Sequence, residues 1–419
     1  MSKKVSLLTF VLCLILAVLV TFMLTFTLLS DTLREKMADA YGEPVTGDLD
    51  ASSEDPEYFE KIQLIENIME AYSYYDIEAE DFIDSLLKGM VGGIGDKYAE
   101  YYTPEEFDLL QNDTNGEMQG IGINIIYNAD YQVIEVINVM PDSPALEAGI
   151  LPGDLIVSVG IGENAEDVSA LGYYPAVAKL QGTAGTMCEF TVARGRNYEE
   201  TLDFSIERRA VTIQTVTWHV YEKNKDIGII RIFEFDKKTP EQFKEALSEL
   251  GNKGVKKFIF DLRNNPGGDL DSICEVLDVI LPEGPIIKMK DKAGNESVRK
   301  SDSSELNVDM AVLCNGSTAS AAELFTSAVM DYEKAVTIGT KTYGKGSVQS
   351  LLPLNDGSAI KLTTKMYFPP YSEGYDGIGI TPDIEIEMDE ALLDRYNNIY
   401  LIPDAEDTQL AAAITALNK

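Results

Sequence analysis

Between residues 227 and 338 the sequence alternates short apolar runs with longer helical stretches, and this alternation constrains the fold more than any other feature. The apolar runs are Ile227–Ile232, Lys257–Phe260, Met310–Cys314 and Ala335–Ile338. The helical stretches are Pro240–Leu250, Asp271–Ile280 and Ala319–Met330. Strands that alternate with helices form a largely parallel sheet covered by helices, so we expect an α/β core. Ligands of such sheets bind at the carboxyl ends of the strands.

Residues 116–208 have a different pattern, in which short β-like runs are separated by turn residues. The runs are Gly120–Tyr127, Gln132–Val139, Asp154–Val159, Cys188–Arg194 and Glu200–Ile206. Short helices are predicted over Ser143–Ala148 and Tyr174–Leu180. Because roughly 90 residues are enough for an independent domain, we expect a separate β-rich domain here.

An uncharged run of 25 residues, Val5–Leu29, follows Lys3 and Lys4 near the start of the chain. As a helix it would be about 37 Å long, which is enough to span a bilayer with some tilt. Lysines that precede such a segment stay in the cytoplasm, so everything after Asp31 is expected outside. A cleaved signal peptide is the alternative, but Leu28–Asp31 offers no Ala-x-Ala cleavage site. We therefore expect an uncleaved anchor.

The other domain boundaries follow from composition and from helical periodicity. Small, polar and acidic residues dominate 31–56, and apolar residues recur with a helical period from Tyr58 onward. The expected organisation is a cytoplasmic stub and transmembrane anchor over 1–30, a linker over 31–56, an N-terminal helical region over 57–115, the β-rich domain over 116–208, the α/β core over 209–388 and a C-terminal helical extension over 389–419.

Composition excludes several classes of function. The chain has 34 basic and 70 acidic residues, and a net charge of −36 repels phosphate backbones, so nucleic acid is not expected as a partner. The cysteines are widely spaced and lie in apolar runs, which fits neither a disulfide framework nor a metal cluster. Cys314, the last residue of a buried strand, is expected to be unreactive.

Three motifs point to acyl-transfer chemistry. Asn315–Glu323 places Ser320 at the start of a helix, where a serine is often only a cap for the helix N–H groups. Gly344-Lys345-Gly346 places a lysine, otherwise expected to be a surface charge, between two flexible residues. The chain holds one histidine, His219, which lies in a β-like run and is expected to be structural. A serine nucleophile would therefore need another base, and a desolvated lysine can serve as one.

The third motif, Asp261–Gly268, follows a strand and ends in paired glycines, Gly267 and Gly268. Its structural interpretation is a tight loop between strand and helix. Its functional interpretation is a backbone N–H aimed into a cleft, as one side of an oxyanion hole. Gln349 lies four residues after Lys345 and could orient the amine by hydrogen bonding.

Together these motifs resemble the carboxyl-terminal processing proteases, also called tail-specific proteases, from about Tyr58 to Ile386. The resemblance implies that Ser320 is the nucleophile, Lys345 its base and Gln349 the residue that positions the lysine. It also implies oxyanion donors at the N–H of Ala321 and in the glycine pair, where we favour Gly267 and leave the choice between Gly267 and Gly268 open. The departures are Ala322, where many members carry a second serine, and Cys314 before the asparagine.

The segment 116–208 resembles a PDZ domain, which these proteases carry. Gly120-Ile121-Gly122-Ile123 matches the loop whose consecutive N–H groups receive the C-terminal carboxylate of a peptide. Ser143-Pro144-Ala145 and Gly149–Asp154 match the helix and turn of such domains. The resemblance therefore implies a site for the C-terminal tails of proteins.

The sequence as a whole predicts a membrane-anchored, extracytoplasmic serine endopeptidase that cleaves exported proteins recognised by their C-terminal tails. It is expected to need no metal and no organic cofactor. The resemblance further implies a homodimer that forms through the terminal helical segments. The alternative is a non-catalytic PDZ scaffold that binds exported protein tails without cleaving them.

Overall fold

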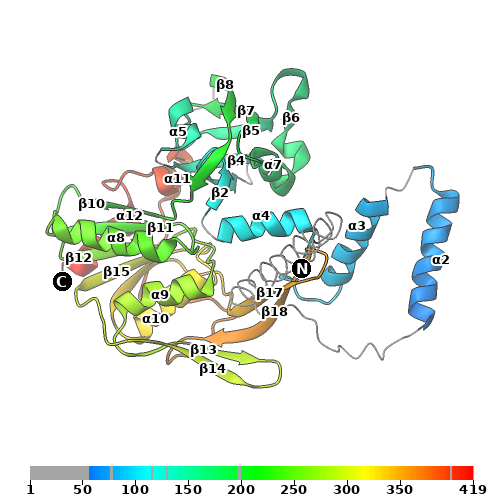
Figure 1. Cartoon of the computed structure of the whole chain (residues 1–419). Helices are drawn as coiled ribbons and strands as arrows, with labels where there is room; N and C mark the ends of the chain where they lie inside the picture. The colour runs from blue at the N-terminus through cyan, green and yellow to red at the C-terminus, as the bar shows by residue number, and fades with distance from the viewer. Residues whose placement is uncertain are drawn as a thin grey trace, which may run out of the picture. The chain divides into compact units, whose positions relative to one another are not determined.

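The computed structural model describes residues 56–75, 79–114, 117–128, 131–140, 142–195, 200–396 and 399–418 (Figure 1). Two compact units divide the chain: Met1–Asp108 with Gln349–Thr364, and Leu109–Val348 with Lys365–Lys419. The predicted membrane anchor Val5–Leu29 and nearly all of the linker lie outside the described residues. Within the described ranges no helix is both long enough and apolar enough to cross a bilayer.

The α/β core belongs to the second unit and contains the predicted sheet. Its strands, in spatial order, are β10 (Val216–Val220), β11 (Ile227–Ile232), β12 (Lys257–Asp261), β15 (Asp309–Cys314), β16 (Ala335–Gly339) and β19 (Ile384–Glu385). Strand β10 is antiparallel to β11, and all the other neighbours are parallel. The expectation of a largely parallel sheet is confirmed.

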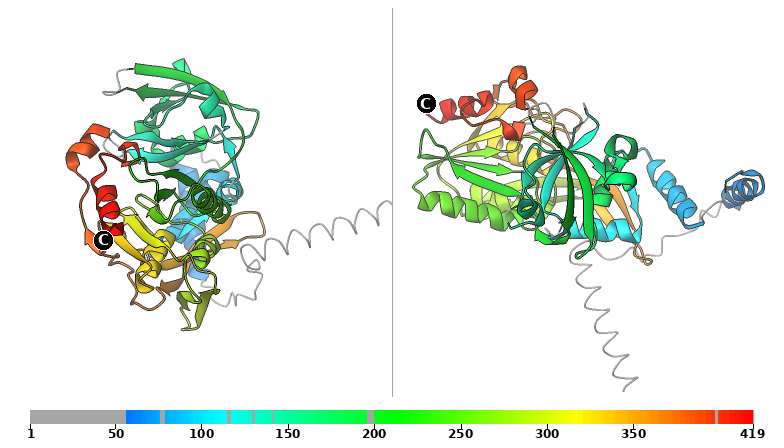
Figure 2. Two further views of the ribbon diagram at one scale, coloured as in Figure 1. Left: turned by 90° about the vertical axis from the view of Figure 1, so that its left-hand side faces the viewer. Right: turned by 90° about the horizontal axis from the view of Figure 1, so that it is seen from above.

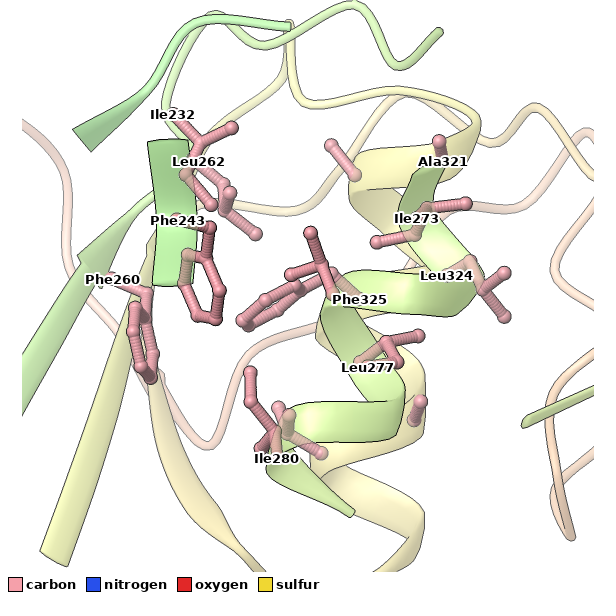
Figure 3. Close-up of a cluster of buried hydrophobic side chains, with 14 of the residues drawn as sticks. Ile232, Phe243, Phe260, Leu262, Ile273, Leu277, Ile280, Ala321, Leu324 and Phe325 are labelled. Carbon is pink, nitrogen blue, oxygen red and sulfur yellow. The ribbon is translucent and has the colours of Figure 1, made fainter. Parts of the chain in front are cut away.

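Successive residues of each strand point to opposite faces of the sheet. Helices cover both of these faces. The core helices are α8 (Thr239–Asn252), α9 (Leu270–Ile280), α10 (Ala321–Asp331) and α12 (Thr408–Leu417). Phe260 of β12 packs against Phe243 of α8 and Phe325 of α10, with ring centroids 5.6 and 5.5 Å apart (Figure 3). Each buried phenylalanine contributes about 1.5–3 kcal/mol to folding.

The opposite face of the sheet is covered by α12. Ile259, the neighbour of Phe260 in β12, belongs to a second cluster with Leu410 and Ala413 of that helix. In Figure 2 this C-terminal helix, drawn in red, lies across the sheet from α8. The C-terminal extension also contains α11 (Glu390–Tyr396) and the short 3-10 helix η2 (Ile399–Leu401).

An antiparallel sheet that was not predicted completes the core. Strand β13 (Gly284–Asp291) pairs with β14 (Glu296–Ser301) and with the end of β18 (Ala359–Phe368), where Lys288 is opposite Phe368. Most of β14 is exposed. Its charged and polar residues gave no buried periodicity from which a strand could be recognised.

The β-rich domain contains strands and helices in the predicted order, together with short elements that were not predicted. Its elements are β2 (Glu117–Gly120), β3 (Ile123–Asn128), β4 (Val133–Val139), α5 (Pro144–Ala148), β5 (Leu155–Val159), η1 (Gly162–Asn164), β6 (Glu166–Asp167), α6 (Val168–Leu171), α7 (Tyr173–Leu180), β7 (Met187–Arg194), β8 (Glu200–Glu207) and β9 (Arg209–Thr212). One prediction was wrong, because the run Gly120–Tyr127 is divided between β2 and β3. Gly122 has a φ of 81°, which a continuous strand does not accommodate.

The first unit contains the N-terminal helices. It comprises α2 (Pro56–Tyr72), α3 (Ala79–Gly92), β1 (Glu100–Tyr102) and most of β17 (Ser347–Pro353), together with the start of β18, while α4 (Pro104–Thr114) extends across the boundary at residue 108. Strand β1 pairs antiparallel with β18, and Glu100 lies 2.7 Å from Lys361. The apolar side chains of α2 are largely exposed, with Phe59 61% exposed.

Candidate active site

Ser320 lies in the sharp turn between β15 and α10. Its φ of 54° and ψ of −118° are strained for a residue with a side chain. The turn is held by hydrogen bonds in both directions: the N–H of Ser320 donates to Glu323 Oε2 at 2.9 Å, and its carbonyl accepts from the N–H of Glu323 at 2.9 Å. The serine is therefore fixed at a helix start, where free N–H groups favour a developing negative charge.

Glu323 joins this turn to the loop over residues 341–346, called the lysine loop below. The carboxylate is completely buried. Its Oε2 accepts from the N–H of Ser320 at 2.9 Å and from the N–H of Lys345 at 2.8 Å. Its Oε1 accepts from Thr342 Oγ1 and from the N–H of Gly344, each at 2.6 Å. The backbone nitrogens of the proposed nucleophile and base thus contact the same oxygen atom.

The glycines beside Lys345 allow the loop to approach a neighbouring segment closely, as expected from the sequence. A Cβ on Gly344, whose φ is 91°, would lie 2.8 Å from the N of Gly379. A Cβ on Gly346 would lie 3.1 Å from the N of Asp376, whose carboxylate accepts from the Gly346 N–H at 2.8 Å. The Lys345 side chain is partly buried. Larger residues at either glycine would displace this loop.

The Asp261–Gly268 motif, called the glycine loop below, lies directly against the turn that contains Ser320. A Cβ on Gly267, at a φ of 102°, would lie 2.7 Å from Ser320 Cβ and 2.8 Å from the N of Ala321. The Gly267 N–H donates to Asn265 Oδ1 at 2.8 Å, and the Asn265 carbonyl accepts from the N–H of Ala319 at 2.9 Å. The structure therefore brings Ser320, Ala321 and Gly267 together, and the N–H of Gly267 is engaged by Asn265.

Position 268 also has no room for a side chain. Its φ is 138°, and an added Cβ would lie 2.1 Å from the carbonyl oxygen of Phe235.

Gln349 lies on β17 in the other unit, where its Nε2 donates to Thr363 Oγ1 at 3.2 Å. Its contact with the Lys345 amine stays a prediction.

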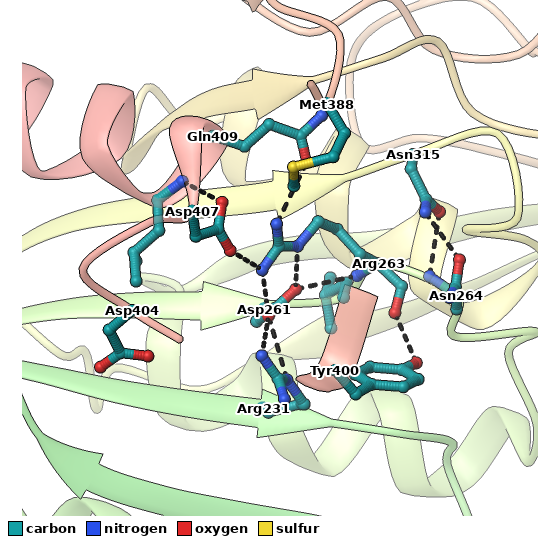
Figure 4. A network of polar contacts seen from close by, with 12 residues as sticks. Arg231, Asp261, Arg263, Asn264, Asn315, Met388, Tyr400, Asp404, Asp407 and Gln409 are labelled. Atoms are coloured by element: carbon teal, nitrogen blue, oxygen red, sulfur yellow. Dashed lines mark hydrogen bonds and ion pairs between the residues drawn. The ribbon is translucent and has the colours of Figure 1, made fainter. Parts of the chain in front are cut away.

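A buried charge network attaches the C-terminal extension to the base of the glycine loop (Figure 4). Arg263, 1% exposed, pairs with Asp261 at 2.7 Å and with Asp407 of the extension at 2.8 Å. Tyr400 donates its hydroxyl to the Arg263 carbonyl at 2.8 Å. Burial by itself raises the pKa of Asp261, but the charges of Arg263 and Arg231 hold it well below its ordinary value.

Cys314 and His219 have side chains that could react, but neither belongs to the site around Ser320 and Lys345. Burial raises the pKa of the Cys314 thiol to about 12, which is consistent with the prediction that this cysteine is unreactive. His219 lies on β10, and its Nε2 is 2.7 Å from Asp404 Oδ2 in the C-terminal extension.

Two carbonyls of the Gly120–Ile123 segment of the β-rich domain are held by backbone hydrogen bonds. Ile121 O accepts from the N–H of Ala145 at 2.8 Å, and Gly122 O accepts from the N–H of Met140 at 3.0 Å. Residues of β3 and α7, including Ile125 and Val177, line a cavity of about 460 Å³. Asn264 and Pro266 of the glycine loop line the same cavity.

Sequence reasoning missed two residues of this site. Glu323 could have been found, because an acidic residue three positions after a helix-capping serine is the signature of a capping box. Tyr367, which donates its hydroxyl to the Lys345 carbonyl at 2.6 Å, lies on a strand whose pairing was not predicted. No signal near Lys345 in the sequence indicates it.

The fold and the site define a serine peptidase that carries a PDZ domain, and comparison with known proteins identifies the family. The model of the PDZ domain matches residues 110–192, and the model of peptidase family S41 matches residues 226–386. A probable CtpA-like serine protease of Staphylococcus saprophyticus is 30% identical over 86% of this chain and 70% of its own length. A carboxy-terminal-processing protease of Bartonella bacilliformis is 32% identical over 74% of this chain and 70% of its own.

A solved structure shows the same fold. The photosystem II D1 C-terminal processing protease is 24% identical, with a TM-score of 0.52 over 82% of this chain and 92% of its own. The chain thus belongs to peptidase family S41, among the C-terminal processing serine proteases.

Proposed function

We propose that this protein is a membrane-anchored, extracytoplasmic serine endopeptidase that cleaves exported proteins recognised by their C-terminal tails, with Ser320 and Lys345 as a catalytic dyad. The observation that carries this proposal is the Glu323 carboxylate, whose Oε2 accepts from the N–H groups of both dyad residues. Glu323 thereby fixes two segments that are separated in the sequence within one site.

In the proposed reaction, Lys345 takes the proton of the Ser320 hydroxyl while the oxygen attacks the peptide carbonyl. The N–H of Ala321 and one N–H of the glycine pair stabilise the oxyanion. Lysine acts as a base only when desolvation favours its uncharged form. Each oxygen of Glu323 already accepts two hydrogen bonds from neutral donors, so this carboxylate has little capacity left for the amine. Gln349 is proposed to orient that amine.

The substrate is proposed to enter through the PDZ domain. Its terminal carboxylate would bind the N–H groups of Gly120–Ile123, and its last residues would add beside β3. The cavity shared by β3, α7, Asn264 and Pro266 supports a path from this loop toward the glycine loop. Protein substrates with accessible C-termini are therefore the proposed partners.

The dyad is tested with the full chain in detergent and a protein substrate that ends in an apolar residue. Wild type should produce fragments, whereas Ser320→Ala and Lys345→Ala should abolish cleavage, since each removes a reacting group. The exposed neighbours Ser317 and Lys341 supply matched controls, and their alanine variants should cleave normally. Cleavage that survives both dyad substitutions would reject the assignment. A wild type that binds the tail without producing fragments would instead indicate the scaffold.

The membrane anchor and the homodimer are further parts of the proposal. Attachment rests on the apolar run Val5–Leu29, so alkaline carbonate should leave the full chain in the membrane and release a variant that lacks residues 1–30. The homodimer rests on the family resemblance and on the exposed apolar side chains of α2. Sedimentation equilibrium of the full chain should give twice the monomer mass, and Phe59→Asp should weaken the association.

A further inference from the structure

A tyrosine of the C-terminal extension holds the base of the glycine loop. Tyr400 lies in η2, and its hydroxyl donates to the carbonyl of Arg263 at 2.8 Å (Figure 4). Its ring meets that of Phe233 edge to face, with centroids 5.3 Å apart, and the guanidinium of Arg231 lies 4.9 Å from the ring centroid. The ring is therefore packed at the end of β11, while the hydroxyl reaches the glycine loop.

The extension is attached to the core by contacts that do not involve this hydroxyl. Ile399 and Ile402, on either side of Tyr400 in the sequence, are buried in one hydrophobic cluster. Further along, Asp407 pairs with the guanidinium of Arg263 at 2.8 Å. Loss of the Tyr400 hydroxyl alone should therefore leave the extension in place.

The peptide unit between Arg263 and Asn264 is held on both of its sides. Its carbonyl accepts from Tyr400, and its N–H donates to Asn315 Oδ1 at 2.9 Å. The Asn315 side chain also donates to Asn264 Oδ1 at 2.7 Å. Because a peptide unit is planar and rigid, two such contacts fix its rotation. One contact comes from the extension, and the other comes from the segment that leads to Ser320.

The orientation of this peptide unit determines the path of the glycine loop. Asn264 has a φ of 59°, in the left-handed region where the chain turns sharply. Beyond it, the Asn265 carbonyl accepts from the N–H of Ala319 at 2.9 Å. At Gly267 an added Cβ would lie 2.7 Å from Ser320 Cβ. With so little space, a small rotation of the peptide unit would move the N–H groups of the glycine pair relative to the serine.

We propose that Tyr400 is a positioning residue of the peptidase, whose hydroxyl fixes the Arg263–Asn264 peptide unit and thereby the distance from the glycine pair to Ser320. The proposal rests on the dyad and the oxyanion donors proposed above. Oxyanion donors stabilise the transition state when they lie about 2.7–3.1 Å from the oxygen. A displacement of about 1 Å can reduce the rate by roughly 100-fold. Tyr400 acts through the loop and not on the reacting atoms.

The test compares Tyr400→Phe with Tyr396→Phe in the full chain, using the same apolar-tailed protein substrate at a temperature below both melting transitions. Tyr396 donates its hydroxyl to Glu406 Oε1 at 2.9 Å within the same extension, so its variant is a matched control. Each variant removes one hydroxyl from a hydrogen bond, and both should melt slightly below wild type.

The kinetic constants of the two variants should differ. Tyr400→Phe should lower kcat by about 5- to 50-fold. Its KM should change less than about twofold, because the aromatic ring still lines the cavity beside Asn264 and Pro266. Tyr396→Phe should keep kcat within about twofold of wild type.

Two binding measurements separate positioning of the loop from a general loosening of the extension. With a peptide aldehyde, the Ser320 oxygen bonds to the aldehyde carbon, the serine proton passes to Lys345, and the aldehyde oxygen becomes an oxyanion. The inhibition constant of this aldehyde should rise in Tyr400→Phe by the factor by which kcat/KM falls. An apolar-tailed peptide, measured by fluorescence anisotropy in the Ser320→Ala background, should bind with a Kd changed less than about twofold.

Three results would overturn the proposal. The first is a kcat for Tyr400→Phe equal to that for Tyr396→Phe. The second is an aldehyde inhibition constant that does not follow kcat/KM. The third is a loss confined to KM or to the affinity for the tail peptide, which would place Tyr400 in the tail site instead.

These results are distinguishable from failure of the dyad. If Ser320→Ala and Lys345→Ala abolish cleavage while Tyr400→Phe cleaves as wild type does, only the positioning role is rejected. If both dyad variants still cleave, the dyad itself is rejected, and the Tyr400 proposal falls with it.

Discussion

Two buried carboxylates, Glu323 and Asp261, organise the loops of the candidate site. One is stabilised by hydrogen bonds from uncharged donors, and the other by ion pairs. Glu323 accepts from three backbone N–H groups and one hydroxyl, all uncharged. Asp261 is paired with the guanidinium groups of Arg263 and Arg231. The first lies between the proposed nucleophile and base, whereas the second lies at the base of the glycine loop, where Arg263 also pairs with Asp407.

The two kinds of partner suggest different roles, with Glu323 acting in catalysis and the Asp261 network in stability. A guanidinium beside the proposed dyad would place a full positive charge next to the lysine. The neutral donors around Glu323 hold the loops without adding such a charge. At the glycine loop, charge pairing connects the core to the C-terminal extension. We therefore expect changes at Asp261 and its partners to alter unfolding, and changes at Glu323 to alter catalysis.

The largest effect is expected at Arg263. Arg263→Met leaves Asp261 and Asp407 buried without their shared cation, so the free energy of unfolding should fall by about 3–5 kcal/mol. Urea denaturation followed by circular dichroism measures this loss. Arg395→Met removes an exposed pair with Glu406 and should cost less than about 1 kcal/mol. Equal losses in the two variants would show that the buried network does not hold the extension.

Glu323→Gln should have the next largest effect, and it should fall on catalysis. The amide NH₂ must face either the N–H groups of Ser320 and Lys345 or the donors of Thr342 and Gly344, so one loop is displaced. A displacement of this kind should reduce kcat by about 100-fold. Glu333→Gln, an exposed change two residues beyond the end of α10, should be neutral. Normal kcat in Glu323→Gln would remove this carboxylate from the site.

Acid should weaken the Asp261 network. Because the pKa of Asp261 is lower in the folded chain than in the unfolded one, its stabilising contribution is complete above about pH 4 and is lost as the pH falls further. One such group changes the free energy of unfolding by at most about 1.4 kcal/mol per pH unit. Arg231→Gln removes one of the two lowering charges and so raises the folded-state pKa of Asp261, which should make the total acid loss smaller and end it at a higher pH. Identical acid profiles would exclude Arg231 from the coupling.

The sequence predicted the elements that are defined by local pattern. The strands of the parallel sheet were recognisable, because buried strands such as β15 carry continuous apolar runs, here Met310–Cys314. The turn at Ser320 was recognisable from a strand followed by a helix-capping residue. These features depend on neighbours in the chain, so their location could be predicted without knowing the fold.

Long-range partners could not be predicted in this way. Tyr367 reaches Lys345 only because β18 returns beside the lysine loop, and Asp407 reaches Arg263 from 144 positions further along the chain. Neither segment carries a mark of its partner. The engagement of the Gly267 N–H by Asn265 likewise depends on a side-chain rotamer that no pattern specifies.

The smallest effect is expected at His219, and it tests the choice of base. His219 Nε2 contacts Asp404 at a partly exposed position, where an ion pair contributes about 0–1 kcal/mol. His219→Gln should therefore change kcat by less than about twofold, because the proposed base is a lysine. As the chain has one histidine, this variant removes every imidazole from it. A hundredfold loss of kcat in a folded His219→Gln would mean that an imidazole contributes to catalysis, and a Ser320–Lys345 mechanism could not account for it.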